Sequence, residues 1–126
     1  MGLRFIKIAV VYLVIGATLG LGMGMAQTFT LAPVHAHLVL LGWASLALAG
    51  IVYHLYPTAI ETRLARIHFR LHNLGLPCFM AALALMLLGR EAIVPFLAGS
   101  ATVVLVGLFV FAANVLINIR PASDAR

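Results

Sequence analysis

Five histidines are the residues of this chain best suited to chemistry, since 64% of the sequence is hydrophobic and only three residues are acidic. Imidazole can ligate a metal or a haem iron, and it can exchange protons near neutral pH. Ionisable groups inside apolar segments are costly, which makes them functional candidates by default. The histidines fall into two groups: His35 and His37, then His54, His68 and His72.

His35 and His37 lie in one apolar stretch, where helical geometry turns residues two apart by roughly 200°. They therefore cannot both face one ligand. The face of His35 is small and includes Gly42, whereas the face of His37 is typical of a lipid-facing stripe. A flat macrocycle needs small residues beside its axial ligand, which favours His35. Trp43, at mid-helix, is an interior packing residue that could contact an aromatic ligand. The alternative is that both histidines are solvated among lipid headgroups.

His68 and His72 are one helical turn apart and share an apolar face with Gly75 and Leu76. At this spacing both histidines could bind one metal ion such as copper. Alternatively, one of them could ligate haem while the other binds a haem propionate. His54 lies on the same side of the membrane in this interpretation and is a further metal-ligand candidate. Alternatively, His68 is a solvated boundary residue.

Two asparagines near the end of the last apolar stretch could support these histidines. Asn114 and Asn118 are interpreted as hydrogen-bonding groups between helices, with a histidine N–H as the alternative partner.

The elements that must position these residues are four apolar helices. Only 9% of the residues are charged, against roughly 25% in a soluble domain. A span needs about 20 apolar residues. The sequence therefore predicts an all-α integral membrane four-helix bundle, a single transmembrane domain over 1–126 with the lipid bilayer as its surroundings. The predicted helices cover about 5–25, 34–56, 68–88 and 93–118.

The basic residues predict the orientation of this bundle. In a four-span hairpin, seven of the eight fall on one side, and only Arg90 falls on the other. By the positive-inside rule, both termini are cytoplasmic, in a bacterial cytoplasmic membrane. The net charge of +5 does not indicate nucleic-acid binding, because the basic residues sit at the ends of apolar runs. The seven are Arg4, Lys7, Arg63, Arg66, Arg70, Arg120 and Arg126.

Small residues and the lone cysteine complete the pattern. Gly16, Gly20 and Gly24 recur every four residues, a spacing that favours close helix packing over room for a cofactor. Because Cys78 is the one cysteine in the sequence, an internal disulfide is excluded, and Cys78 is interpreted as an inert packing residue.

One segment carries a resemblance to a known family. It reads His35-Ala-His37-Leu-Val39-Leu-Leu-Gly-Trp and continues to Tyr-His-Leu-Tyr-Pro57. It resembles helix 2 of haem-copper oxidase subunit I, most closely the nitric oxide reductase and cbb3-type branches. The resemblance extends less clearly to the segment from His68, and it implies haem b with His35 or His37 as an axial ligand. Val39 replaces an asparagine of the family motif.

The resemblance stops short of a complete oxidase or reductase. The sequence has no His-Pro-Glu motif and no adjacent histidine pair, which together build the copper centre in that family. The expected function is therefore electron transfer with a redox partner, or sensing of a diatomic gas. The alternatives are an accessory protein for haem or copper handling in oxidase assembly, and a small metal transporter.

Depth along the predicted spans adds a constraint. His35 lies about 10 residues above the middle of its span and His72 about six below, a difference of roughly 24 Å. Two axial bonds of about 2 Å cannot bridge that gap. Either a second chain of a homo-oligomer supplies the other ligand, or the haem is five-coordinate, or the inner histidines (His54, His68 and His72) form a separate site.

Overall fold

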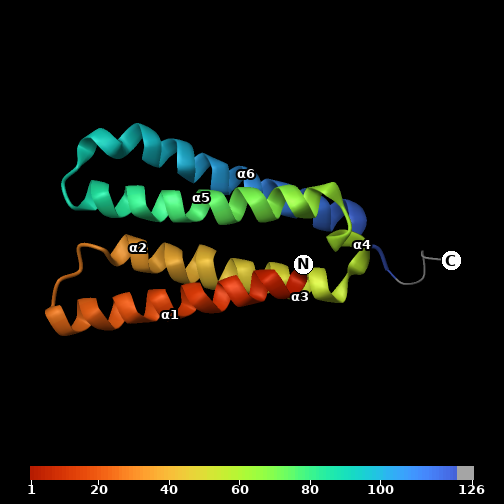
Figure 1. Ribbon diagram of the computed structural model, residues 1–126, viewed down its shortest axis with the longest axis horizontal. Helices are drawn as coiled ribbons and strands as arrows, with labels where there is room; N and C mark the ends of the chain where they lie inside the picture. The colour runs from red at the N-terminus through yellow and green to blue at the C-terminus, as the bar shows by residue number, and fades with distance from the viewer. Residues whose placement is uncertain (122–126) are drawn as a thin grey trace.

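The computed structural model describes residues 1–121 and contains helices without strands in that range (Figure 1). Four of its segments are long and apolar enough to cross a membrane. This confirms the prediction of four apolar helices. The segments are Gly2–Ala26, Ala32–Leu55, Arg63–Leu87 and Glu91–Asn118.

The second segment is not the uninterrupted helix that the sequence predicted. It consists of α2 (Ala32–His37), a π-helical stretch η1 (Leu38–Ala44) and α3 (Ser45–Leu55). In the wider π-helical turn, the Ser45 N–H donates to the carbonyl oxygen of Leu40, five residues back. Leu41 O therefore does not receive the Ser45 N–H that an α-helix would supply.

The third helix, α5 (Arg63–Leu87), begins five residues before the predicted position 68. Thr62 caps it, because its side chain accepts a hydrogen bond from the Ala65 N–H. The prediction was wrong here because the basic residues after Thr62 were assigned to a loop. A short helix, α4 (Pro57–Ile60), joins α3 to this cap.

The helices form two antiparallel hairpins (Figure 1). In one, α1 (Gly2–Ala26) packs against η1 and α3; in the other, α5 packs along α6 (Val94–Asn118), which follows the single turn η2 (Glu91–Ile93). The turn between α5 and η2 uses Gly89 at φ +94°, a conformation that favours glycine.

Both ends of the described chain and α4 lie at one end of the bundle, here called the termini end (Figure 1). The opposite end is called the hairpin end. The basic residues of α1 and of the start of α5 belong to the termini end, and Arg90 belongs to the hairpin end. This arrangement matches the predicted four-span hairpin, whose cytoplasmic orientation stays a prediction. Arg126 lies outside the described residues.

The core consists of two clusters of buried side chains. The cluster nearer the termini end contains Phe5, Leu46 and Tyr53, with Trp43 packed against it. The other contains Leu38, Leu76 and Val104. Histidines occur at the border of both clusters, so the fold places polar groups within an apolar interior.

Candidate functional site

His68 and His72 are fully enclosed. His68 is 1% exposed and His72 is 0% exposed. Their rings lie 5.5 Å apart, centroid to centroid, at an interplanar angle of 76°. Phe5 and Phe111 flank the His68 ring at 5.2 Å and 4.9 Å. His68 is therefore not a solvated boundary residue, and this alternative from the sequence is wrong.

A polar network joins His68 to α4 and to the end of α6. The hydroxyl of Tyr53 lies 3.1 Å from His68 Nδ1. Asn114 Nδ2 donates to Ala59 O at 2.9 Å and lies 3.4 Å from the Tyr53 hydroxyl. The side-chain oxygen of Asn114, Oδ1, accepts from Asn118 Nδ2 at 2.8 Å. Asn114 thus links three helices and reaches a histidine only through Tyr53, as expected of an interhelical hydrogen-bonding group.

Replacing Asn114 with leucine should lower the free energy of unfolding by about 1.5 kcal/mol. Interhelical hydrogen bonds in membranes contribute from about 0.6 to about 1.7 kcal/mol each. Ala59 O would lose one of its two donors and keep the Thr62 hydroxyl. The measurement is equilibrium unfolding in mixed detergent micelles. Asn73→Leu is the matched control, because Asn73 bonds only within its own helix and its Oδ1 is buried without a partner. Equal loss of stability in the two variants would contradict the proposed importance of the network.

His72 forms a hydrogen bond with Leu41 O, the carbonyl oxygen that does not accept from the Ser45 N–H in the π-helical stretch. Because a carbonyl oxygen only accepts, His72 Nε2–H donates to Leu41 O, at 2.8 Å. The other ring nitrogen, Nδ1, is buried without a hydrogen-bond partner. His72 therefore links α5 to the middle of the second segment.

This contact also corrects the depth argument. Leu41 is six residues from His35, about 9 Å along a helix axis. His72 reaches Leu41 O directly, so the estimate of roughly 24 Å was too large. Part of the error came from starting the third helix at 68, which displaced the middle of that span by three residues, about 4.5 Å, toward the hairpin end.

His35 and His37 point toward different helices, as the helical spacing predicted. His35 Nδ1–H donates to Gly16 O of α1 at 2.7 Å, and a Cβ atom at Gly20 would lie 2.7 Å from His35 Cε1. His37 Nδ1–H donates to Pro33 O within its own segment at 2.7 Å, and its ring meets Phe79 edge-on. In both His35 and His37 the Nδ1–H donates to a carbonyl oxygen, so Nε2 of the neutral ring keeps a free lone pair.

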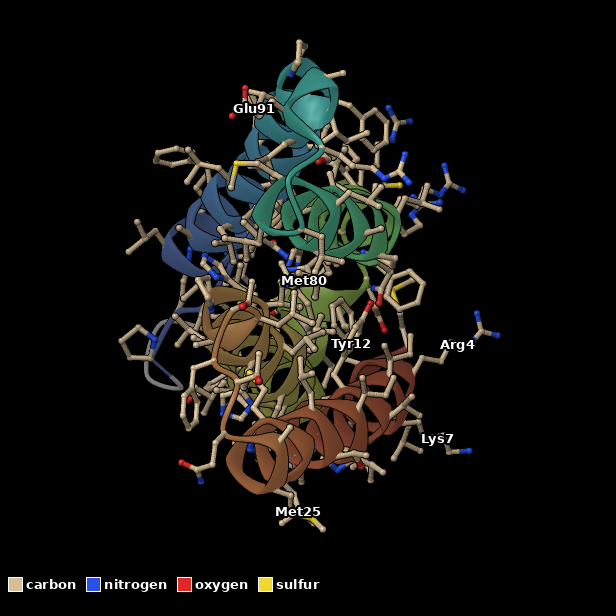
Figure 2. The ribbon with its side chains drawn as sticks, turned by 90° about the vertical axis from the view of Figure 1, so that its left-hand side faces the viewer. Arg4, Lys7, Tyr12, Met25, Met80 and Glu91 are labelled. Atoms are coloured by element: carbon tan, nitrogen blue, oxygen red, sulfur yellow. The ribbon has the colours of Figure 1, made fainter. Side chains whose placement is uncertain are left out.

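The remaining candidates are dispersed. Tyr12 occupies the space beside Gly42, since a Cβ atom on Gly42 would lie 2.6 Å from Tyr12 Cγ. Figure 2 shows Tyr12 pointing from α1 into the bundle. Trp43 is partly buried against the cluster around Phe5, a packing position as interpreted. His54 is exposed and borders a separate concavity of about 250 Å³ beside Tyr53.

These placements bear on metal binding. Within residues 1–121, no three or more of His, Cys, Asp and Glu gather in a group that could hold a metal ion. His54 thus does not join His68 and His72 in a three-ligand set. Cys78 is exposed and lines an apolar groove of about 530 Å³ between α5 and α6, which contains no histidine.

The two histidine groups differ in how well they fit a haem. Aromatic rings fill the surroundings of His68, and His72 uses its Nε2 on Leu41 O, so the inner pair leaves no space for a macrocycle. His35 fits one axial position, because a metal-ligating histidine almost always donates its other N–H to a carbonyl or carboxylate. The Gly16 carbonyl has that role here.

Fold and composition define the class of this molecule, an all-helical integral membrane protein with four candidate spans. No family model, curated protein or solved structure matches the chain.

Proposed function

We propose that this protein binds haem b near the hairpin end of the bundle, with His35 Nε2 as an axial ligand. The observation that carries the proposal is the hydrogen bond from His35 Nδ1 to Gly16 O. It fixes the ring against a neighbouring helix and leaves Nε2 as the lone-pair nitrogen. His37 bonds only to its own segment and packs against Phe79, so its ring is less firmly oriented for a ligand.

The surface beside His35 supports a haem shared between chains. On α1, Gly20 lies against the His35 ring, while Gly24, one turn further along the same face, has no neighbouring atom near the position of a Cβ. A flat apolar group or a second helix can approach such a surface closely. One chain offers His35 alone at this position, so a homo-oligomer supplies the other side of the macrocycle.

The proposed role is electron transfer to or from a redox partner, or sensing of a diatomic gas, in a bacterial cytoplasmic membrane with both termini cytoplasmic. A bound haem supplies one-electron chemistry and an axial position for a gas. The chain's own contribution is to orient one imidazole and to hold the site within the apolar part of the membrane.

Absorption spectra of protein purified from haem-replete cells test this proposal. We expect a Soret band in the native chain and in His54→Ala, and at least a tenfold lower haem content per chain in His35→Ala, because the axial bond is lost. His37→Ala distinguishes the two candidates and should retain most of the haem. Pure native protein without a Soret band would overturn the proposal, and haem loss only in His37→Ala would overturn the choice of ligand.

A further inference from the structure

The start of α5 carries three arginines on one exposed face. Arg63, Arg66 and Arg70, together with Ile67, line a concavity of about 220 Å³. Their spacing of three and four residues places them in a row along the helix. His68 and His72 occupy the opposite, buried face. The arginines are thus directed away from the polar network.

This row is electrostatically unfavourable on its own. The N-terminal end of a helix carries a partial positive charge, and like charges three or four residues apart repel each other. The first turn of α5 contains no acidic residue. Glu61 alone precedes it nearby in the sequence, and Glu91 lies at the hairpin end (Figure 2). A bound anion would relieve the repulsion.

The same face is partly apolar. Ile67 is 44% exposed and Leu74 is 71% exposed, on either side of Arg70 along the helix. Arg70 lies about 10 Å along the axis from Arg63, which places its Cα within the apolar part of the span. Helical side chains lean toward the N-terminus, so the Arg70 guanidinium is directed back toward Arg66 and Arg63.

We propose that this face binds the phosphate of an anionic phospholipid. Guanidinium groups bind phosphate oxygens in pairs of parallel hydrogen bonds, so three in a row provide a multidentate site. The exposed Ile67 and Leu74 lie about one and three turns beyond Arg63, where the acyl chains of a lipid anchored at the arginines run along α5. Soluble phosphate offers the same headgroup chemistry without those apolar contacts, which favours the lipid as the source.

Native mass spectrometry of the full chain, titrated with phosphatidylglycerol or phosphatidylcholine in detergent, tests this site. A basic residue at an anionic membrane surface contributes enough binding energy for about a fivefold change in affinity. We expect phosphatidylglycerol to bind in preference, and Arg66→Gln and Arg70→Gln each to weaken its binding about fivefold. Arg90→Gln, at the hairpin end, is the matched control and should bind like the native chain.

Three results would overturn the proposal. Equal affinity of the native chain for the two lipids, or equal weakening by Arg90→Gln and Arg70→Gln, would show that the arginines form no specific site. Displacement of phosphatidylglycerol by inorganic phosphate at equal concentration would overturn the lipid as ligand and assign the site to a soluble phosphate.

Discussion

Replacing His72 with leucine is expected to lower the free energy of unfolding by about 2 kcal/mol, although leucine is apolar and similar in size. The cause is the carbonyl group of Leu41. Its oxygen accepts from His72 Nε2 at 2.8 Å, while the Ser45 N–H bonds to Leu40 instead. Without the imidazole, a part-buried backbone acceptor loses its donor, and an unpaired acceptor away from water costs about 1–3 kcal/mol. The measurement is equilibrium unfolding of haem-free protein in mixed detergent micelles.

Two further variants separate this cause from a general effect of losing a histidine. His72→Gln retains an N–H donor and should recover part of the lost stability. His54→Leu removes an exposed histidine and should leave the unfolding midpoint unchanged. If His72→Leu and His54→Leu unfold at the same detergent composition as the native chain, Leu41 O does not depend on His72.

The same variant has a local signature at the π-helical stretch. When His72 no longer binds Leu41 O, the π-helical stretch loses the contact that ties its backbone to α5. Hydrogen exchange at the amides of residues 42–46 should therefore change in His72→Leu more than exchange in the middle of α1. This readout reports on backbone hydrogen bonding rather than on overall stability.

Much of the helical framework could be predicted from the sequence. Apolar runs of sufficient length indicated four helices. The spacing of His35 and His37 predicted their divergence, and the structure confirms it through Gly16 and Phe79. These features follow from local periodicity, which the sequence displays directly.

The features that the sequence concealed depend on contacts between distant segments. The π-helical turn depends on a donor from another helix, His72, which lies 31 positions beyond Leu41. The rest of the depth error arose because each span was placed separately, without the contact between His72 and Leu41 O that sets their relative position. Thr62 was a missed local signal: a threonine followed by three helix-compatible residues is a typical N-cap. The arginines that follow it made the segment look like a loop.

Gly42 shows why a small residue is ambiguous in sequence. It was interpreted as room for a macrocycle beside His35, but the Tyr12 ring occupies that space. A tyrosine within an apolar helix carried no periodic signal that would have paired it with Gly42. The glycine is therefore required for the close approach of α1 and η1, and its effect on His35 is indirect.

Replacing Gly42 with alanine is consequently expected to destabilise the fold by about 3 kcal/mol, at the upper end of the usual range for overpacking. The new methyl group would lie 2.6 Å from Tyr12 Cγ and 2.7 Å from Tyr12 Cβ. Because Cβ moves only with the backbone, no rotamer change of Tyr12 relieves the contact, and α1 must move away from η1. Equilibrium unfolding of the haem-free chain measures the loss.

Gly22→Ala is the matched control for this substitution. Gly22 is also helical, but a Cβ atom there has no neighbour within 4 Å, so alanine should be neutral or stabilising by up to about 1 kcal/mol. A displaced α1 also withdraws Gly16 O from His35 Nδ1, whose hydrogen bond orients the proposed ligand. Gly42→Ala should therefore bind less haem than Gly22→Ala at equal purity. Equal stability of the two variants would contradict the packing argument, whereas equal haem content with unequal stability would show that α1 does not orient His35.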